Sequence, residues 1–208
     1  MPRFFGPFRA SFAAALLGLA IPVLMTGCTK SMTFPTTYVT PEYNESPIQL
    51  TAGQFRPVVF VSEVQDDRPS NVAGAVGGVT FRSGRELHQF VHRELEGQLS
   101  SDGVPLGRSQ VDAQSQSNST REVVVRIRSV SYGGATSLLH KTVGGINLLI
   151  SVNDENGRPV FAQTYFGSSF HGRALPTSEN GGELMSKAVQ EAVTKAVRDA
   201  KFRAAVGL

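Results

Sequence analysis

Apolar and polar residues alternate along three stretches in the second half of the chain, which is the pattern of half-buried strands. In 122–132, valines and an isoleucine would face a core while Arg126 and Arg128 would face the opposite side. The segment 141–152 alternates in the same way, and the Asn-Gly pair after it is typical of a tight hairpin turn. The segment 159–167 would return as the third strand, so we predict a meander.

Two other stretches repeat apolar residues every three to four positions, as amphipathic helices do. Ser83 and Glu86 have the spacing of a capping box before the first helix, and Gly103 and Pro105 would end it. The second is the alanine-rich segment 183–202. Its small side chains would let the helix pack close to a sheet.

The order of these elements predicts the fold class. A β-branched apolar run at 57–64 adds a strand before the first helix, which gives strand, helix, three strands, helix. We therefore expect an α+β domain, an antiparallel or mixed sheet of about four strands with two helices packed on one face. The glycine-rich stretch 65–82 is expected to be a loop with a mobile lid at 74–78, and 110–120 an exposed loop.

The N-terminus has a different pattern. Residues 1–12 contain two arginines and no acidic residue, and 13–25 is an uncharged run of 13 residues. A membrane-spanning helix needs about 20 apolar residues, so this run is too short to span and fits the core of a signal peptide. The small residues Thr26 and Gly27 precede Cys28, which is the only cysteine. We predict cleavage after Gly27.

The sequence Met25-Thr26-Gly27-Cys28 resembles the bacterial lipobox, in which leucine is commoner at the position of Met25. The resemblance implies a thioether-linked diacylglycerol and an acylated amine on Cys28. Enterobacterial lipoproteins retained in the inner membrane carry aspartate at the next position, where this chain has Thr29. The resemblance therefore implies delivery to the inner leaflet of the outer membrane, facing the periplasm. The alternatives are an ordinary signal peptide with a chance cysteine and a cysteine buried in the core.

The chain thus divides into a signal peptide at 1–27, a lipidated cysteine with a flexible tether at 28–55 and a periplasmic α+β domain at 56–208. Cleavage also changes the charge, because two of the 20 Lys and Arg residues leave while all 17 Asp and Glu residues stay. A mature chain this close to neutral lacks the basic face of a nucleic-acid binder, so we expect no nucleic-acid partner. Without a second cysteine, the domain forms no internal disulfide.

The whole pattern resembles the YajG family of bacterial lipoproteins over roughly residues 10–200. The matching features, in order, are the lipobox, a Pro/Thr-rich tether, a strand ending at Asp67-Arg68, the helix LHQFVHRELEGQLSSDG, the strand VVVRIRSVSYG, a turn at Glu155-Asn156-Gly157, a strand through Tyr165-Phe166 and an alanine-rich terminal helix. The resemblance implies a location and a fold rather than a settled activity. Similar layouts occur in lipoproteins that assist ABC-type transporters or lipopolysaccharide assembly, and in activators of peptidoglycan synthases.

Two groups of charged residues are candidate binding sites. Asp66, Asp67 and Arg68 follow the first strand and would form a partner-binding loop, since exposed loops on a rigid sheet often carry recognition. The alternative is a turn in which aspartate caps local amides and pairs with arginine. Arg126 and Arg128 would form a basic strand face for lipid phosphates or an acidic partner. The alternative there is a solvated sheet face.

Other candidate chemistry is weaker. His88 and His92 have metal-ligand spacing on the first helix, but no third ligand or HExxH pattern accompanies them, so we expect no metal. The glycines at 74–78 lack the spacing of a phosphate-binding loop, and no GxSxG elbow is present. These observations predict a protein with no cofactor and no catalytic activity.

The sequence therefore favours a non-enzymatic accessory or binding lipoprotein of the outer membrane, with an envelope protein as its partner. That partner would contact the 65–82 loop and the basic strand face. An alternative is a binder of envelope lipid or peptidoglycan fragments, in a groove between helix and sheet, including an auxiliary component of an ABC-type lipid transport system. A hydrolase is a third possibility, and the oligomeric state stays open.

Overall fold

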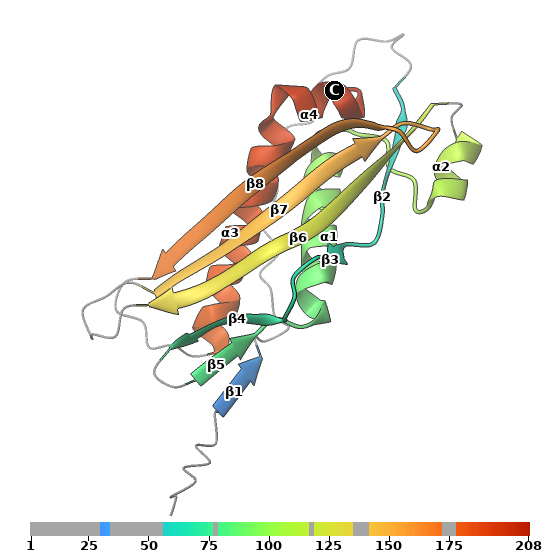
Figure 1. The fold of residues 1–208 in the computed structure, drawn as a ribbon. Coiled ribbons are helices and arrows are strands. Elements are labelled where there is room, and N and C mark those ends of the chain that lie inside the picture. The colour runs from blue at the N-terminus through green and yellow to red at the C-terminus, as the bar shows by residue number, and fades with distance from the viewer. Residues whose placement is uncertain (1–29, 34–55, 77–78, 117–118, 135–141, 172–177) are drawn as a thin grey trace, which may run out of the picture.

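The structure is a computed structural model that describes residues 30–33, 56–76, 79–116, 119–134, 142–171 and 178–208 (Figure 1). The expected signal peptide, its cleavage site at Gly27 and the lipidation site Cys28 lie outside the described residues. In chain order the elements are β1 (Lys30–Thr33), β2 (Val58–Val61), β3 (Gln65–Asp66), β4 (Val72–Val76), β5 (Val79–Arg82), α1 (Arg85–Ser101), α2 (Gln110–Gln116), β6 (Thr120–Gly134), β7 (Thr142–Asn153), β8 (Pro159–His171), α3 (Ser178–Arg198) and α4 (Ala200–Val206).

The main sheet has the strand order β2-β6-β7-β8, with β3 pairing to β6 beyond the end of β2. The predicted meander is confirmed, because β6, β7 and β8 pair antiparallel along nearly their whole lengths. At the hairpin between β7 and β8, Gly157 has φ +73° and the Asp154 carboxylate accepts the amides of Asn156 and Arg158 at 2.9 Å. Strands β2 and β3 run parallel to β6, so the sheet is mixed and has five strands instead of about four.

A second, smaller sheet has the order β1-β5-β4. The predicted loop over 65–82 is wrong, because β3, β4 and β5 form there and β4 pairs antiparallel with β5. The glycine that suggested a mobile lid has a packing role instead. Gly74 lies so close to β6 that a Cβ atom would overlap the carbonyl oxygen of Tyr132. Lys30–Thr33, within the predicted tether, forms β1 beside β5.

Helix α1 begins one residue later than the capping box predicts. Its N-cap is Gly84, and no side chain caps it. The Ser83 hydroxyl instead accepts a hydrogen bond from Arg68 Nη1 at 2.7 Å. The capping-box prediction is therefore wrong, because a tertiary contact takes the hydroxyl that would have bonded the helix.

The C-terminal helical segment is two helices, where the sequence predicts one. Asp199 separates α3 from α4, and its carboxylate accepts the amides of Lys201 at 2.8 Å and Phe202 at 3.3 Å as the N-cap of α4. The helical pattern of the sequence does not indicate this break, because Phe202, which is fully buried, continues the apolar stripe beyond it. Helix α2 also occupies most of the described part of the predicted 110–120 loop.

Helices α1 and α3 cover the same face of the main sheet, as predicted (Figure 1). The core between them and the sheet contains the inward residues of β6 and β7 and the apolar stripes of both helices. Helix α3 packs closely through Ala188, Ala192 and Ala196, which have no exposed surface. A Cβ atom on Gly167 of β8 would overlap the carbonyl oxygen of Ala188, so this glycine permits the close approach.

The edge of the main sheet at β8 is partly occupied by side chains of α3. Glu191 accepts the amide of Ser168 at 2.6 Å, and Lys195 donates to the carbonyl oxygen of Phe166 at 2.9 Å. Glu191 and Lys195 also pair with each other at 2.8 Å. None of the helices in the described ranges is long and apolar enough to cross a membrane.

Candidate functional site

Arg68, predicted to present its charge on an exposed loop, is half-buried as a residue, and only 4% of its side chain is accessible. Its Nε donates to Asp66 Oδ1 at 2.7 Å and its Nη2 to Asp66 Oδ2, while Nη1 donates to Ser83. The Arg68 amide also bonds Asp66 Oδ1 at 3.1 Å. These are the contacts of the alternative in which aspartate caps a local amide and pairs with arginine.

Asp67 lies on the other side of the strand and contacts the predicted basic face. It accepts a hydrogen bond from Arg128 Nη1 at 2.8 Å, and Arg126 Nη1 lies 3.8 Å from the same oxygen. The contact forms because β3 pairs alongside β6 and the Asp67 amide bonds the carbonyl oxygen of Ile127 at 3.1 Å. The structure thus divides the five predicted binding residues into two groups, Asp66 with Arg68 and Asp67 with Arg126 and Arg128. Much of the charge is neutralised within each group.

The ion pair between Asp66 and Arg68 gives stability a dependence on pH. The hydrogen bond from the Arg68 side chain lowers the pKa of Asp66 to about 2, although burial acts in the opposite direction. A carboxyl group with a lower pKa in the folded chain adds stability above its unfolded pKa, and that stability is lost as the pH falls through about 2. We expect Asp66→Asn to lower the free energy of unfolding by about 1 kcal/mol at neutral pH, because solvent screens this partly exposed group.

Urea unfolding at neutral pH and near pH 2 measures this effect. The loss caused by Asp66→Asn should shrink toward zero in acid. Glu155→Gln is the control, since Glu155 makes a single exposed ion pair with Arg121 at 3.1 Å. An equal loss for Asp66→Asn at both pH values would contradict a role for the ionised carboxylate.

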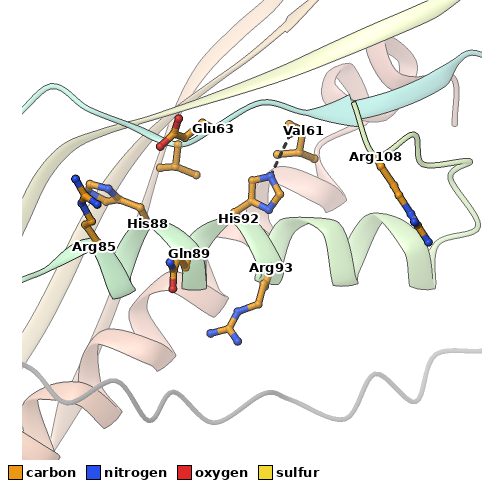
Figure 2. A pocket seen from close by; sticks show the side chains of 9 residues that line it. Val61, Glu63, Arg85, His88, Gln89, His92, Arg93 and Arg108 are labelled. Carbon is orange, nitrogen blue, oxygen red and sulfur yellow. Dashed lines mark hydrogen bonds between the residues drawn. The ribbon is translucent and has the colours of Figure 1, made fainter. Parts of the chain in front are cut away.

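A groove of about 770 Å³ lies between α1 and the segment that joins β2 to β3, and we call it the α1 groove. Figure 2 shows His88 and His92 projecting from α1 toward Glu63 and Val61, while Gln89 and Arg93 extend from the other side of the helix in this view. Nine of the described residues line it: Val61, Glu63, Val64, Arg85, His88, Gln89, His92, Arg93 and Arg108. Seven of these nine residues are polar or charged, and one of them is acidic.

The electrostatics of the α1 groove are dominated by arginine. Arg85, Arg93 and Arg108 are exposed, and none of them forms an ion pair with a residue that the structure describes. Glu63 is the one carboxylate in the described lining. The groove therefore has a net positive charge, and its walls concentrate that field.

The two histidines in the lining are tied to the protein. His88 Nε2 lies 3.2 Å from Asp66 Oδ2. His92 Nε2 donates to the carbonyl oxygen of Val61 at 3.1 Å, shown dashed in Figure 2, and its Nδ1 lies 3.3 Å from Glu96. They therefore hold α1 against the edge of the sheet. Among the described residues, no three His, Cys, Asp or Glu side chains gather as a metal site.

A second hollow of about 350 Å³ continues the α1 groove along the helix and shares Arg93 and Arg108 with it. Ser100 lines its far end. At 1.5 Å per helical residue, the distance from Arg85 to Ser100 is roughly 22 Å. The combined surface is long enough for an extended ligand, with Arg93 near its middle.

Sequence reasoning did not single out these arginines. Arg85, Gln89 and Arg93 recur every four residues, and this polar stripe could have indicated a common face of the helix. Arg108 comes from the chain after α1. It reaches the groove because Pro105–Gly107 bonds to the edge of β2 at Val59.

No family model and no curated protein matches the chain, so the resemblance to the YajG family stays a prediction. Solved structures do match at low identity. A minor lipoprotein from Acinetobacter baumannii is 9% identical over 70% of this chain and 93% of its own, with a TM-score of 0.44. A Xanthomonas campestris protein of the DUF330 family is 13% identical over 81% and 90%, with a TM-score of 0.47. The PelC dodecamer subunit from Paraburkholderia phytofirmans is 15% identical over 66% and 88%, with a TM-score of 0.38.

Proposed function

We propose that this protein is a lipid-anchored binding protein of the bacterial envelope that holds an anionic ligand in the α1 groove. The observation that supports this most is the set of three arginines in the groove, Arg85, Arg93 and Arg108, which lack ion-pair partners among the described residues. A charged side chain that stays unpaired in a concave surface is available for a ligand, whereas the arginines of the other candidate sites are already bonded.

The ligand class follows from the chemistry of arginine. A guanidinium group donates two parallel hydrogen bonds to a carboxylate or a phosphate, and its charge does not depend on pH in the physiological range. In the envelope, peptidoglycan stem peptides carry carboxylates and membrane lipids carry phosphates. The volume of about 770 Å³ is in the range of small-molecule sites. We therefore favour a groove that binds envelope lipid or peptidoglycan fragments over a protein partner on the 65–82 segment.

Arg68 and Asp67 are the reason for that preference. The Arg68 side chain is 4% exposed and all three guanidinium nitrogens are hydrogen-bonded, so it cannot reach a partner without leaving Asp66. Asp67 is shared with Arg126 and Arg128. A partner at this surface would have to compete with contacts that the protein already makes.

The location and the lack of catalysis are also proposals. The lipobox at Met25–Cys28 supports an acylated Cys28 and a domain on the periplasmic side of the outer membrane. The described lining of the α1 groove contains no serine, threonine or cysteine that could act as a nucleophile. We therefore propose binding without chemistry.

Isothermal titration of the full mature chain in a nonionic detergent tests the groove. One arm uses a muramyl tripeptide and the other uses dihexanoyl phosphatidylglycerol, so that carboxylate and phosphate ligands are distinguished. We expect one of them to bind and Arg93→Gln to weaken that binding about tenfold, the loss of one charge-assisted hydrogen bond.

Arg158→Gln is the matched control, because Arg158 is exposed in the turn between β7 and β8 and does not line the groove. Its affinity should equal that of the unaltered chain. Binding of neither compound, or an equal loss in both variants, would count against the α1 groove as the site.

A further inference from the structure

An apolar patch lies on the outer face of the main sheet, the face opposite the helices. It consists of Val143, Phe166 and Phe170, whose exposed fractions are 44%, 50% and 64%. Val143 and Phe170 are cross-strand partners on β7 and β8, so their side chains are neighbours on one face. Phe166 is four residues before Phe170 on the same face, with its ring over Gly145. Large exposed apolar side chains that gather in this way usually mark a contact surface.

The patch lies at the end of the domain that also carries the small sheet. Strand β4 crosses β6 at Tyr132, where Gly74 meets its backbone. The next residue, Gly133, pairs with Val143, which pairs with Phe170. Strands are spaced about 4.8 Å apart, and the path from β1 through β5, β4, β6 and β7 to β8 has five steps, so β1 and Phe170 are separated by about 25 Å. Figure 1 shows β1, the start of β7 and the end of β8 at the same end of the molecule.

The predicted lipid anchor is close to this end of the domain. Strand β1 begins at Lys30, so only Thr29 separates the folded sheet from Cys28. Two residue steps span at most about 7 Å. An acylated Cys28 would therefore hold β1 at the membrane surface, without the stand-off that a long tether would give.

We propose that this end of the domain lies on the phospholipid surface and that Val143, Phe166 and Phe170 contact it as a second attachment beside the acyl chains. The proposal rests on the lipid anchor of the proposed function but not on the α1 groove. An anchored protein meets its membrane continuously, and the patch lies at the anchored end. A phospholipid surface is therefore the occupant that the geometry favours over a second copy or another protein. Apolar side chains at the level of the headgroups add to acyl-chain binding.

The chain has no tryptophan, which makes a single-tryptophan reporter possible. The lipidated full-length mature chain would carry Phe170→Trp and be reconstituted in vesicles of phosphatidylethanolamine and phosphatidylglycerol with brominated acyl chains. We expect the emission to shift to the blue and the bromines to remove most of it. Val111→Trp is the matched control, because Val111 is 76% exposed on α2. That helix contacts the opposite end of β6, on the order of 40 Å away. Its emission should stay unquenched.

Each of the following results would overturn the proposal. Equal, weak quenching of both reporters would place the patch in water. A blue shift without quenching that grows with protein density would indicate a second copy on the patch. Mass spectrometry of the N-terminus is run on the same sample. An unacylated Cys28 would refute the anchor together with this inference, whereas an acylated Cys28 with no quenching would refute the inference alone.

Discussion

Replacing Gly167 by alanine is expected to lower the free energy of unfolding by roughly 3 kcal/mol. Gly167 lies in β8 where α3 approaches, and a Cβ atom would overlap the carbonyl oxygen of Ala188 and lie 2.8 Å from the amide nitrogen of Ala192. Both contacts are helix backbone, which cannot rotate away as a side chain can. The helix would have to move off the sheet, and the alanine contacts along α3 would be lost together. Urea unfolding followed by circular dichroism measures the change.

Gly133→Ala is the matched control for this experiment. Gly133 is also in a strand, and a Cβ atom there would meet nothing within 4 Å. Its substitution should change the free energy of unfolding by less than about 0.5 kcal/mol. If Gly167→Ala were as mild as Gly133→Ala, the close approach of α3 to β8 would be wrong.

Arg68→Met is expected to cost about 2 kcal/mol, the second large effect, because the hydrogen bonds of its guanidinium to Asp66 and Ser83 are lost together. The substitution keeps the apolar stem of a side chain that is 4% exposed, but it leaves Asp66 without its main partner and Ser83 without a donor. Asp66 is partly exposed, so solvent replaces part of what its carboxylate loses, and the cost comes mainly from the hydrogen bonds of the enclosed Arg68 guanidinium. The loss should appear as a lower urea midpoint with an unchanged slope.

Arg128→Met is the control, because Arg128 is half exposed and pairs with Asp67 at 2.8 Å. An exposed pair contributes at most about 1 kcal/mol. Adding Asp66→Asn to Arg68→Met should recover part of the stability, since the unpaired charge is then removed. Similar losses for Arg68→Met and Arg128→Met would show that the pair with Asp66 is not the source of the effect.

The strands of the meander could be predicted from sequence because each is long and has one face exposed to solvent. In β6, Val123, Val125 and Ile127 are fully buried while Arg126 and Arg128 are exposed, which is the alternation that the sequence displays. Local rules were enough because consecutive strands joined by a short turn pair with each other.

The small sheet could not be predicted in the same way. Gly74 suggested flexibility, but its lack of a side chain is required by a contact with Tyr132, 58 residues further along the chain. The parallel pairing of β2 with β6 likewise joins distant segments and has no local signal. The predicted capping role of Ser83 also fails because of a distant contact. Its hydroxyl accepts a hydrogen bond from Arg68 and does not cap the helix that follows it.

The candidate site also has a part that can be predicted from sequence and a part that depends on contacts between distant segments. Arg85 and Arg93 share a helix face that the sequence displays, but only the fold brings Arg108 to them from a separate segment. Conversely, the sequence around Arg68 predicts an exposed loop charge, whereas in the structure the Arg68 guanidinium is hydrogen-bonded to Asp66 and Ser83. A charged residue can be located by pattern, whereas its availability depends on what packs around it.

The side chains of α3 at the edge of β8 also bear on how such a protein behaves when many copies share one membrane. Molecules attached to a bilayer are confined to two dimensions and collide often. A bare strand edge would then template addition of a neighbour's strand. Glu191 and Lys195 occupy outward-facing backbone groups of Ser168 and Phe166, so an incoming strand would first have to displace them. The edge is therefore protected against intermolecular sheet growth under the crowding that the proposed lipid anchor would create.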